Sequence, residues 1–164
     1  MRKISGRFGA VVVTALMGMM LAAAIAAPAQ SLKTLQSFDV TDGAYPSAAL
    51  IQATNGNLYG TTKYGGASLC NGYGCGTVFK ITPSGTLTTL YSFCSQTGCT
   101  DGSFPDAALV QATDGNFYGT TGGGGANGNY GTVFKITPSG TLTTLYNFCY
   151  QGNCTDGFGP AGLV

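Results

Sequence analysis

Residues 76–91 read GTVFKITPSGTLTTLY, and the same sixteen letters return at residues 131–146. Such an identity is the mark of an internal duplication, so the sequence indicates a tandem-repeat protein. The offset is 55 residues here, but it is 59 for AALIQATNGNLYGTT (residues 48–62), which returns as AALVQATDGNFYGTT (residues 107–121). The four-residue difference lies in the loop between residues 62 and 76, where the two copies also differ most in sequence.

The repeat divides the rest of the chain into segments. Residues 31–38, SLKTLQSF, match the end of each repeat, TLYSF or TLYNF. We therefore expect residues 30–41 to hold the last strand of a preceding or closing unit, followed by repeat 1 at 42–100 and repeat 2 at 101–155. Residues 156–164 would begin a truncated repeat 3, and we expect the sequence to be a fragment of a longer array.

Residues 1–29 have the three parts of a secretory signal peptide. Arg2, Lys3 and Arg7 precede an apolar run at residues 10–27, and Ala-Pro-Ala at 27–29 supplies a cleavage site. The alternative is an N-terminal membrane anchor, because the apolar run just reaches spanning length. The small residues favour cleavage, which predicts a secreted or cell-surface protein with no membrane span afterwards.

Each repeat shows four strand signals, at residues 48–54, 57–62, 76–82 and 86–93 of repeat 1. Asn55-Gly56 between the first two predicts a type I′ hairpin turn, which needs positive φ at both residues. Pro83-Ser84-Gly85 predicts the turn between the last two. Apolar side chains lie on both faces of these strands, as expected when a sheet is covered on both sides.

Four-stranded antiparallel units of this length are typical of a β-propeller. The expected fold class is therefore all-β, a propeller-like array with about two complete units. The composition agrees, because 27 of the 164 residues are Gly and only 8% are charged.

The pattern DGxxPxAxLxQATDGNxYGTTxxGGxxxxGTVFKITPSG resembles the Gloeo/Verruco (GloVer) tandem repeat of exported bacterial proteins. Members are described as choice-of-anchor proteins, which share the repeats and differ in a C-terminal surface anchor. The resemblance covers residues 31–164 and implies a secreted or surface location. The resemblance supplies no enzymatic activity to carry over, and we expect the C-terminal anchor to lie outside this sequence. A shorter likeness links the DGN hairpins to lactonase-type and streptogramin-lyase-type propellers.

The cysteines fall in three C-x4-C pairs: Cys70–Cys75, Cys94–Cys99 and Cys149–Cys154. Repeat 2 lacks both counterparts of the first pair, and such a joint loss is expected of bonded partners. In an exported protein these spacings predict three local disulfides. The alternative is metal binding by thiolates, which the absence of His disfavours.

Asp-Gly turns recur, with Asp42, Asp101 and Asp156 at one repeat position and Asn55 and Asp114 at another. Calcium coordination is one interpretation. The other is that each short side chain bonds its own turn backbone, and we favour it because each loop offers one such group. We expect no metal and no cofactor.

Three tyrosines in the variable loops, Tyr64, Tyr73 and Tyr130, are expected to be exposed and are the candidate ligand-binding residues. Aromatic side chains there suit a glycan or protein partner, although packing over a neighbouring hairpin explains them equally well. Net charge is +1 for the whole chain, and the mature chain keeps four Lys against six Asp. Without a clustered basic surface, no nucleic-acid partner is expected.

No catalytic constellation is present, because the chain has no His and all six acidic residues are Asp. The sequence favours a non-enzymatic binding or structural role at the bacterial surface. The alternative is a secreted propeller enzyme, lactonase-like or lyase-like, with its active-site residues in blades outside this sequence.

Overall fold

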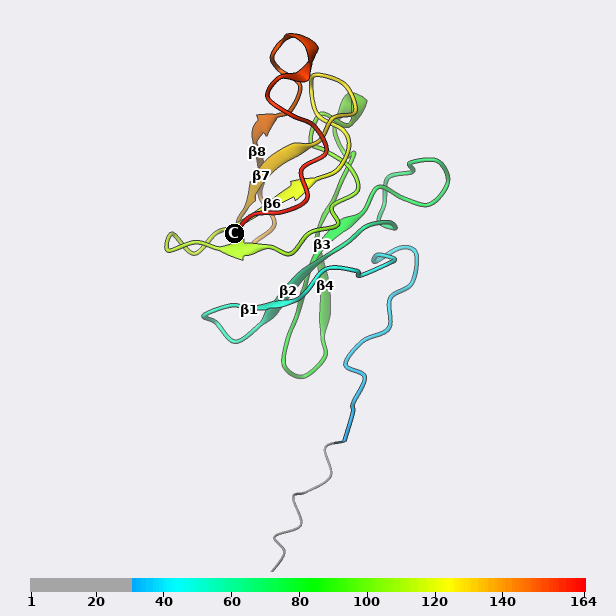
Figure 1. Ribbon diagram of the computed structural model, residues 1–164. Helices are drawn as coiled ribbons and strands as arrows, with labels where there is room; N and C mark the ends of the chain where they lie inside the picture. The colour runs from blue at the N-terminus through cyan, green and yellow to red at the C-terminus, as the bar shows by residue number, and fades with distance from the viewer. Residues whose placement is uncertain (1–30) are drawn as a thin grey trace, which may run out of the picture. The chain divides into compact units, whose positions relative to one another are not determined.

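Each repeat folds as a four-stranded antiparallel sheet, in a computed structural model that describes residues 31–164. The strands of a repeat pair in sequence order, which is a meander (Figure 1). The predicted all-β class and the four strands per repeat are confirmed, while the expected signal peptide lies outside the described residues. Repeat 1 contains β1 (Ile51–Gln52), β2 (Leu58–Thr62), β3 (Thr77–Ile81) and β4 (Leu87–Ser92). Repeat 2 contains β5 (Val110–Gln111), β6 (Phe117–Thr121), β7 (Thr132–Ile136) and β8 (Leu142–Asn147).

The hairpin between β1 and β2 differs from the predicted type I′ turn. Only Gly56 has positive φ, at 80°, and Asn55 does not. The backbone closes through bonds from Gly56 N to the carbonyl of Ala53 and from Ala53 N to that of Asn57, both 2.9 Å. Asn55 Oδ1 also accepts a hydrogen bond from Asn57 N at 3.0 Å. These bonds define a three-residue loop in which Asn55 bonds its own turn and only Gly needs the left-handed region.

The hairpin between β3 and β4 agrees with its prediction. Gly85 takes φ 98° and donates its N–H to the carbonyl of Thr82 at 2.9 Å. Pro83 occupies a position where no backbone donor is needed. The identical sequence forms the same turn at residues 137–141, so this hairpin is the invariant part of the scaffold.

The two sheets pack front to back within the compact unit formed by residues 33–164. The Tyr59 ring stacks on Phe117 with centroids 4.0 Å apart, and Phe93 meets Phe134 edge-on at 5.2 Å. The counterpart of Phe117 in repeat 1 is Leu58, the neighbour of Tyr59 on β2. Neighbouring strand residues point to opposite faces of a sheet, so repeat 1 uses one face of its sheet and repeat 2 uses the opposite face in this contact. Contacts of this heterologous kind can be repeated indefinitely or closed into a ring.

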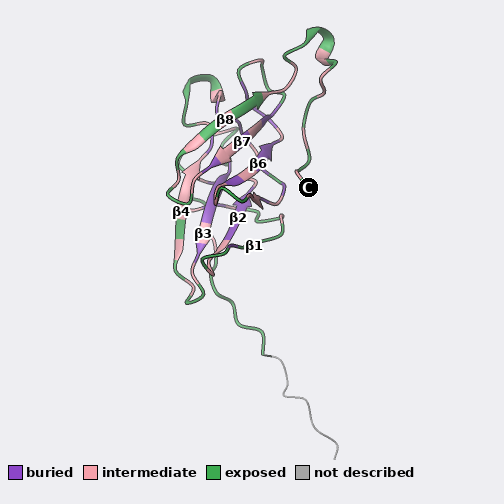
Figure 2. Cartoon of the chain, turned by 90° about the vertical axis from the view of Figure 1, so that its left-hand side faces the viewer, coloured by how far each residue is buried: buried purple, intermediate pink, exposed green. Residues whose placement is uncertain are grey.

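Buried residues follow the central strands of both sheets, whereas β8 is largely exposed (Figure 2). The shared core cluster includes side chains from both repeats, such as Val78, Leu109 and Ile136. The sequence pattern, with apolar side chains on both faces of the strands, therefore predicted correctly that the sheets are covered on both faces. Among residues 31–164, no helix is long and apolar enough to cross a membrane.

Residues 31–38, expected to form a closing strand, are assigned no strand. A strand needs a hydrogen-bonded partner, and none of the described strands pairs with this segment. Phe38 nevertheless packs edge-on against Phe79, with centroids 4.8 Å apart at 65°. Phe93 and Phe134 repeat this geometry one unit later, at 5.2 Å and 64°.

Candidate functional site

A cleft opens where the loop after β2 of repeat 1 faces the start of repeat 2. Its volume is about 740 Å³, within the range of small-ligand sites. Residues 159–161 also line it. The side chains that define the cleft come from three segments of the chain: Tyr45, Lys63, Tyr64, Tyr73, Phe104 and Asp106.

The scaffold fixes the first wall of this cleft at the end of β2. Thr62 Oγ1 donates to the carbonyl of Tyr64 at 2.9 Å and lies 2.8 Å from Thr77 Oγ1. Tyr64 and Ala44 exchange two backbone hydrogen bonds, of 2.8 and 3.0 Å. These hydrogen bonds fix the backbone at residues 62–64, so the start of the loop is held in place although it lies outside the regular sheet.

Four aromatic side chains gather here. The Tyr64 ring lies edge-on to Tyr45 at 5.4 Å and to Phe104 at 5.7 Å. Tyr64 is consequently half-buried, while Tyr45 and Tyr73 each remain 71% exposed. The cleft therefore has two exposed rings, Tyr45 and Tyr73, next to the packed rings of Tyr64 and Phe104.

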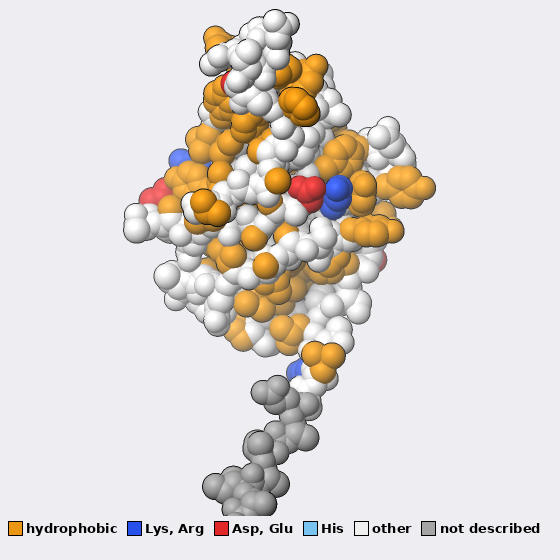
Figure 3. Space-filling model, in the orientation of Figure 1, with side chains coloured by type: hydrophobic (Ala, Val, Ile, Leu, Met, Phe, Trp, Pro, Cys, Tyr) orange, Lys and Arg blue, Asp and Glu red, His pale blue; other side chains and the backbone are white. Residues whose placement is uncertain are grey.

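An ion pair joins the two repeats beside these rings. Lys63 Nζ lies 3.2 Å from Asp106 Oδ2, and each side chain is more than one-third exposed. Figure 3 shows a basic and an acidic side chain in contact among hydrophobic ones on this face. An exposed pair of this kind adds little to stability. It does place a hydrogen-bond donor, Lys63, and an acceptor, Asp106, at the cleft.

The structure brings together two of the three predicted tyrosines. Tyr64 and Tyr73 line the cleft, whereas Tyr130 does not. The expectation that Tyr64 is exposed is wrong, because Tyr45 and Phe104 cover it. Sequence reasoning missed these last two residues, although they occupy one repeat position, the second after Gly in DGAY and DGSF.

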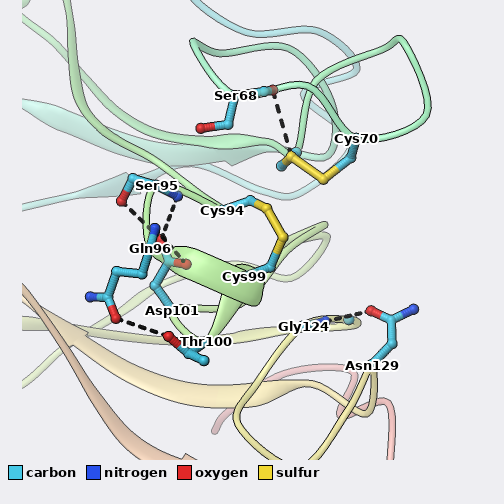
Figure 4. Close-up of a disulfide and its surroundings, with 12 residues drawn as sticks. Ser68, Cys70, Cys94, Ser95, Gln96, Cys99, Thr100, Asp101, Gly124 and Asn129 are labelled. Atoms are coloured by element: carbon cyan, nitrogen blue, oxygen red, sulfur yellow. Dashed lines mark hydrogen bonds between the residues drawn. A yellow bond between two sulfur atoms is a disulfide. The ribbon is translucent and has the colours of Figure 1, made fainter.

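The Cys94–Cys99 loop is built around a buried carboxylate (Figure 4). Asp101 is fully buried, and its Oδ2 accepts hydrogen bonds from Ser95 N at 2.9 Å and Tyr91 Oη at 2.8 Å. The pKa of Tyr91 rises to about 12, chiefly because of burial. Asp156 repeats these bonds with Tyr146 and Tyr150 N in a more exposed loop. The hydrogen bond from Tyr146 holds the pKa of Asp156 below its ordinary value.

The side chain at the Asn55/Asp114 position bonds its own turn, as predicted, whereas Asp101 and Asp156 bond the backbone of the preceding C-x4-C loop. Asp114 Oδ1 accepts from Asn116 N at 3.0 Å, the counterpart of the Asn55 bond. The side-chain bond from Asn116 lowers the pKa of Asp114. Asp42 Oδ1 accepts from Asp39 N at 2.9 Å. Each of these side chains accepts at least one local hydrogen bond, which explains why the residues recur with the turns.

All six cysteines lie in local pairs at disulfide distance, with no free cysteine among residues 31–164. Such pairs are typical of an oxidising, extracellular environment. The Cys70–Cys75 link brackets Tyr73, whose carbonyl accepts from Gly65 N at 2.7 Å. The sulfur atoms of Cys70, Cys75 and Cys94 lie within 4.8 Å of one another. This proximity makes the pairing worth testing, because an exchanged link is within reach.

We expect tryptic digestion without reduction to leave the three pairs on three separate peptides. Cleavage after Lys63, Lys80 and Lys135 yields residues 64–80, 81–135 and 136–164, each with one cysteine pair. Mass spectrometry should find each peptide unlinked and two hydrogens lighter than its reduced form. A peptide joining 64–80 to 81–135 would instead show a Cys70–Cys94 type of link and contradict the local pairing.

The fold and the repeats define the class of this protein: an all-β tandem-repeat protein with a cleft at the repeat junction. The sequence model described as the Gloeobacter/Verrucomicrobia repeat matches residues 21–164, and the chain belongs to this family. The resemblance in the repeat motifs is thereby confirmed. No curated protein matches the chain.

Proposed function

We propose that this chain is an exported or cell-surface repeat protein with a non-enzymatic binding role, and that the cleft at the repeat junction is its binding site. The observation that carries this proposal is the exposure of two aromatic rings, Tyr45 and Tyr73, over a cleft of about 740 Å³. Exposed aromatic groups on loops held by a rigid scaffold are typical of binding surfaces. The disulfide-distance cysteine pairs support the extracellular location.

Differences between the repeats support the same site. The scaffold hairpin is identical in both copies, yet Lys63 and Tyr64 become Gly122 and Gly123 in repeat 2. The loop segment with Cys70 and Tyr73 is shortened there by four residues. Repeat 1 thus departs from repeat 2 where it builds the cleft, as expected if the cleft serves recognition and the hairpins serve packing.

The proposal can be tested by adsorption of the labelled chain to washed envelopes of the bacterium that produces it. We expect Tyr73→Ala to reduce the bound fraction, with Tyr150→Ala as the control because Tyr150 is exposed and outside the cleft. Thermal unfolding of both variants checks that the fold is intact. Adsorption of the Tyr73 variant at the level of the control would place the binding site elsewhere.

We also propose that the repeats are blades of a propeller-like array, with a further repeat on the outer face of repeat 2. Thr61 Oγ1 donates to the carbonyl of Ala107 across the repeat interface at 3.1 Å. Its counterpart Thr120 is equally buried, but Thr120 Oγ1 has no hydrogen-bond partner among residues 31–164. Leu145 on the same repeat is 50% exposed, whereas its counterpart Leu90 packs on the core. Phe38 on Phe79 supports the matching role for residues 31–38, as the last strand of another blade.

This proposal predicts opposite effects of one substitution at two equivalent positions. Thr61→Val should lower the free energy of unfolding by about 1 kcal/mol, since a buried hydrogen bond is lost. Thr120→Val should be neutral or stabilising, because it replaces a buried unpaired hydroxyl. Urea unfolding of both variants measures the difference. Equal destabilisation by the two would contradict it, whereas in a chain extended by a full third repeat Thr120→Val should become destabilising.

A further inference from the structure

We infer that the cleft binds a neutral oligosaccharide, with sugar rings packed on Tyr45 and Tyr73 and neighbouring hydroxyls on the Lys63–Asp106 pair. This inference rests on the proposed binding function and names its ligand class. Four features carry it: the backbone at Tyr45, the charge balance of the lining, the donors and acceptors of the polar pair, and the preorganised loop around Tyr73.

The backbone at Tyr45 is one that a side chain rarely adopts. Tyr45 has φ 58°, in the left-handed region that favours glycine. The equivalent residues Phe104 and Gly159 have the same φ of 58°. All three equivalent positions line the cleft; the third carries Gly, which suits this backbone, while the first two carry aromatic rings. Strained positions of this kind cluster at ligand-binding sites.

The charge balance excludes a preference for ions. Among residues 31–164, Lys63 and Asp106 are the only charged residues that line the cleft, and they neutralise each other at 3.2 Å. A phosphate or carboxylate ligand would need an unpaired cation, and a cationic ligand an unpaired carboxylate. A ligand that is polar but uncharged fits the cleft better.

The polar pair matches the hydroxyl groups of a sugar. Lys63 Nζ has three donors and uses one on Asp106 Oδ2, while the carboxylate has further acceptor sites. A hydroxyl both donates and accepts, so two adjacent sugar hydroxyls can bond the ammonium and the carboxylate together. The C–H faces of the same sugar can pack on an exposed tyrosine ring, which offers an apolar face with a polar tip.

The loop that carries Tyr73 is held in place before any ligand binds. The Cys70–Cys75 link closes the loop around Tyr73, and two backbone bonds hold Tyr73 to Cys70 and Gly65 at 3.1 and 2.7 Å. Less conformational entropy is therefore lost when a ligand binds. Repeat 2 has no such loop, so one chain offers one cleft of this composition among residues 31–164.

The competing occupant is a proline-rich peptide, because aromatic-lined grooves also bind polyproline helices. Proline rings lack hydroxyl groups and cannot use both members of the Lys63–Asp106 pair in the way a diol can. The pair consequently decides in favour of the sugar, and its removal is a useful test.

Affinity electrophoresis of the full chain in native gels tests the inference. The gels contain a neutral polysaccharide (hydroxyethylcellulose, galactomannan, xylan or dextran) or, as the charge control, alginate. We expect retardation by at least one neutral polymer and none by alginate. Tyr73→Ala and Tyr45→Gly should each weaken retardation by about tenfold or more, as expected for truncated aromatic anchors. Glycine suits the backbone at residue 45, so that variant should keep its fold.

Controls separate the ligand class from the site. Tyr150→Ala should keep full retardation, and Lys63→Met should weaken it while thermal unfolding stays unchanged. Absence of retardation in every neutral gel overturns the sugar assignment, as does binding of a proline-rich peptide that Tyr73→Ala abolishes. In both cases the proposed site stands if envelope adsorption still depends on Tyr73. Adsorption that is insensitive to Tyr45→Gly and Tyr73→Ala overturns the site itself.

Discussion

Phe117→Ala should lower the free energy of unfolding by about 3–5 kcal/mol, the usual cost of removing a buried aromatic ring. Phe117 is fully buried and stacks on Tyr59 of the other repeat at 4.0 Å. The cavity would open in the interface between the two sheets. Since domains of this size are stable by about 5–15 kcal/mol, the variant should lose a large part of its stability. Urea unfolding followed by circular dichroism measures the change.

The same position in repeat 1 provides the control. Leu58 is the counterpart of Phe117 but is only half-buried, beside a hollow between residues 35–38 and β3. Leu58→Ala should therefore cost much less, about 1–2 kcal/mol, because less apolar surface leaves contact with protein. Equal losses at the two positions would mean that packing within each sheet, and not packing between the repeats, dominates stability.

The contrast between these positions shows what the sequence could predict. The strands, the hairpin at residues 82–86 and the cover on both sheet faces followed from a period-two pattern, from Pro-Ser-Gly and from the duplication itself. Leu58 and Phe117 have equivalent places in that pattern. Their burial differs because one repeat has a neighbour on its front face and the other has only residues 31–38, which is tertiary information.

The candidate site was predictable only in part, for a similar reason. Tyr64 and Tyr73 could be identified because they lie in the loop where the repeats differ. Tyr45 and Phe104 could not, since they enter the cleft from segments 19 and 40 residues away from Tyr64 in the sequence. A signal did exist: the equivalent residue 159 is Gly, so aromatic rings there are exceptions to the backbone requirement. The Asn55 turn was mispredicted because Asn can satisfy either a left-handed or an Asx-bonded turn, and the local bond from Asn57 decides.

Asp101→Ala should be the second large loss, about 3 kcal/mol, because the hydrogen bonds to a fully buried carboxylate would all be lost. The carboxylate accepts from Ser95 N, Ser95 Oγ and Tyr91 Oη at 2.8–3.0 Å, with full burial of Asp101. Asp101 has no exposed surface, so water reaches this position less readily than it reaches Asp156. The Cys94–Cys99 loop should then open, which hydrogen exchange at Ser95 N and urea unfolding would detect.

Asp156→Ala is the matched control, because Asp156 accepts the equivalent bonds from Tyr146 Oη and Tyr150 N. Its loop is more exposed, so water can take the place of the carboxylate and the loss should be much smaller. A loss as large as that of Asp101→Ala would show that the carboxylate itself, in any environment, is required to form the C-x4-C loop. A loss confined to Asp101 would show that its importance arises from burial by the second repeat. The loop would then require its carboxylate only where another repeat covers it. In that case the stability of each C-x4-C loop depends on the packing of neighbouring repeats.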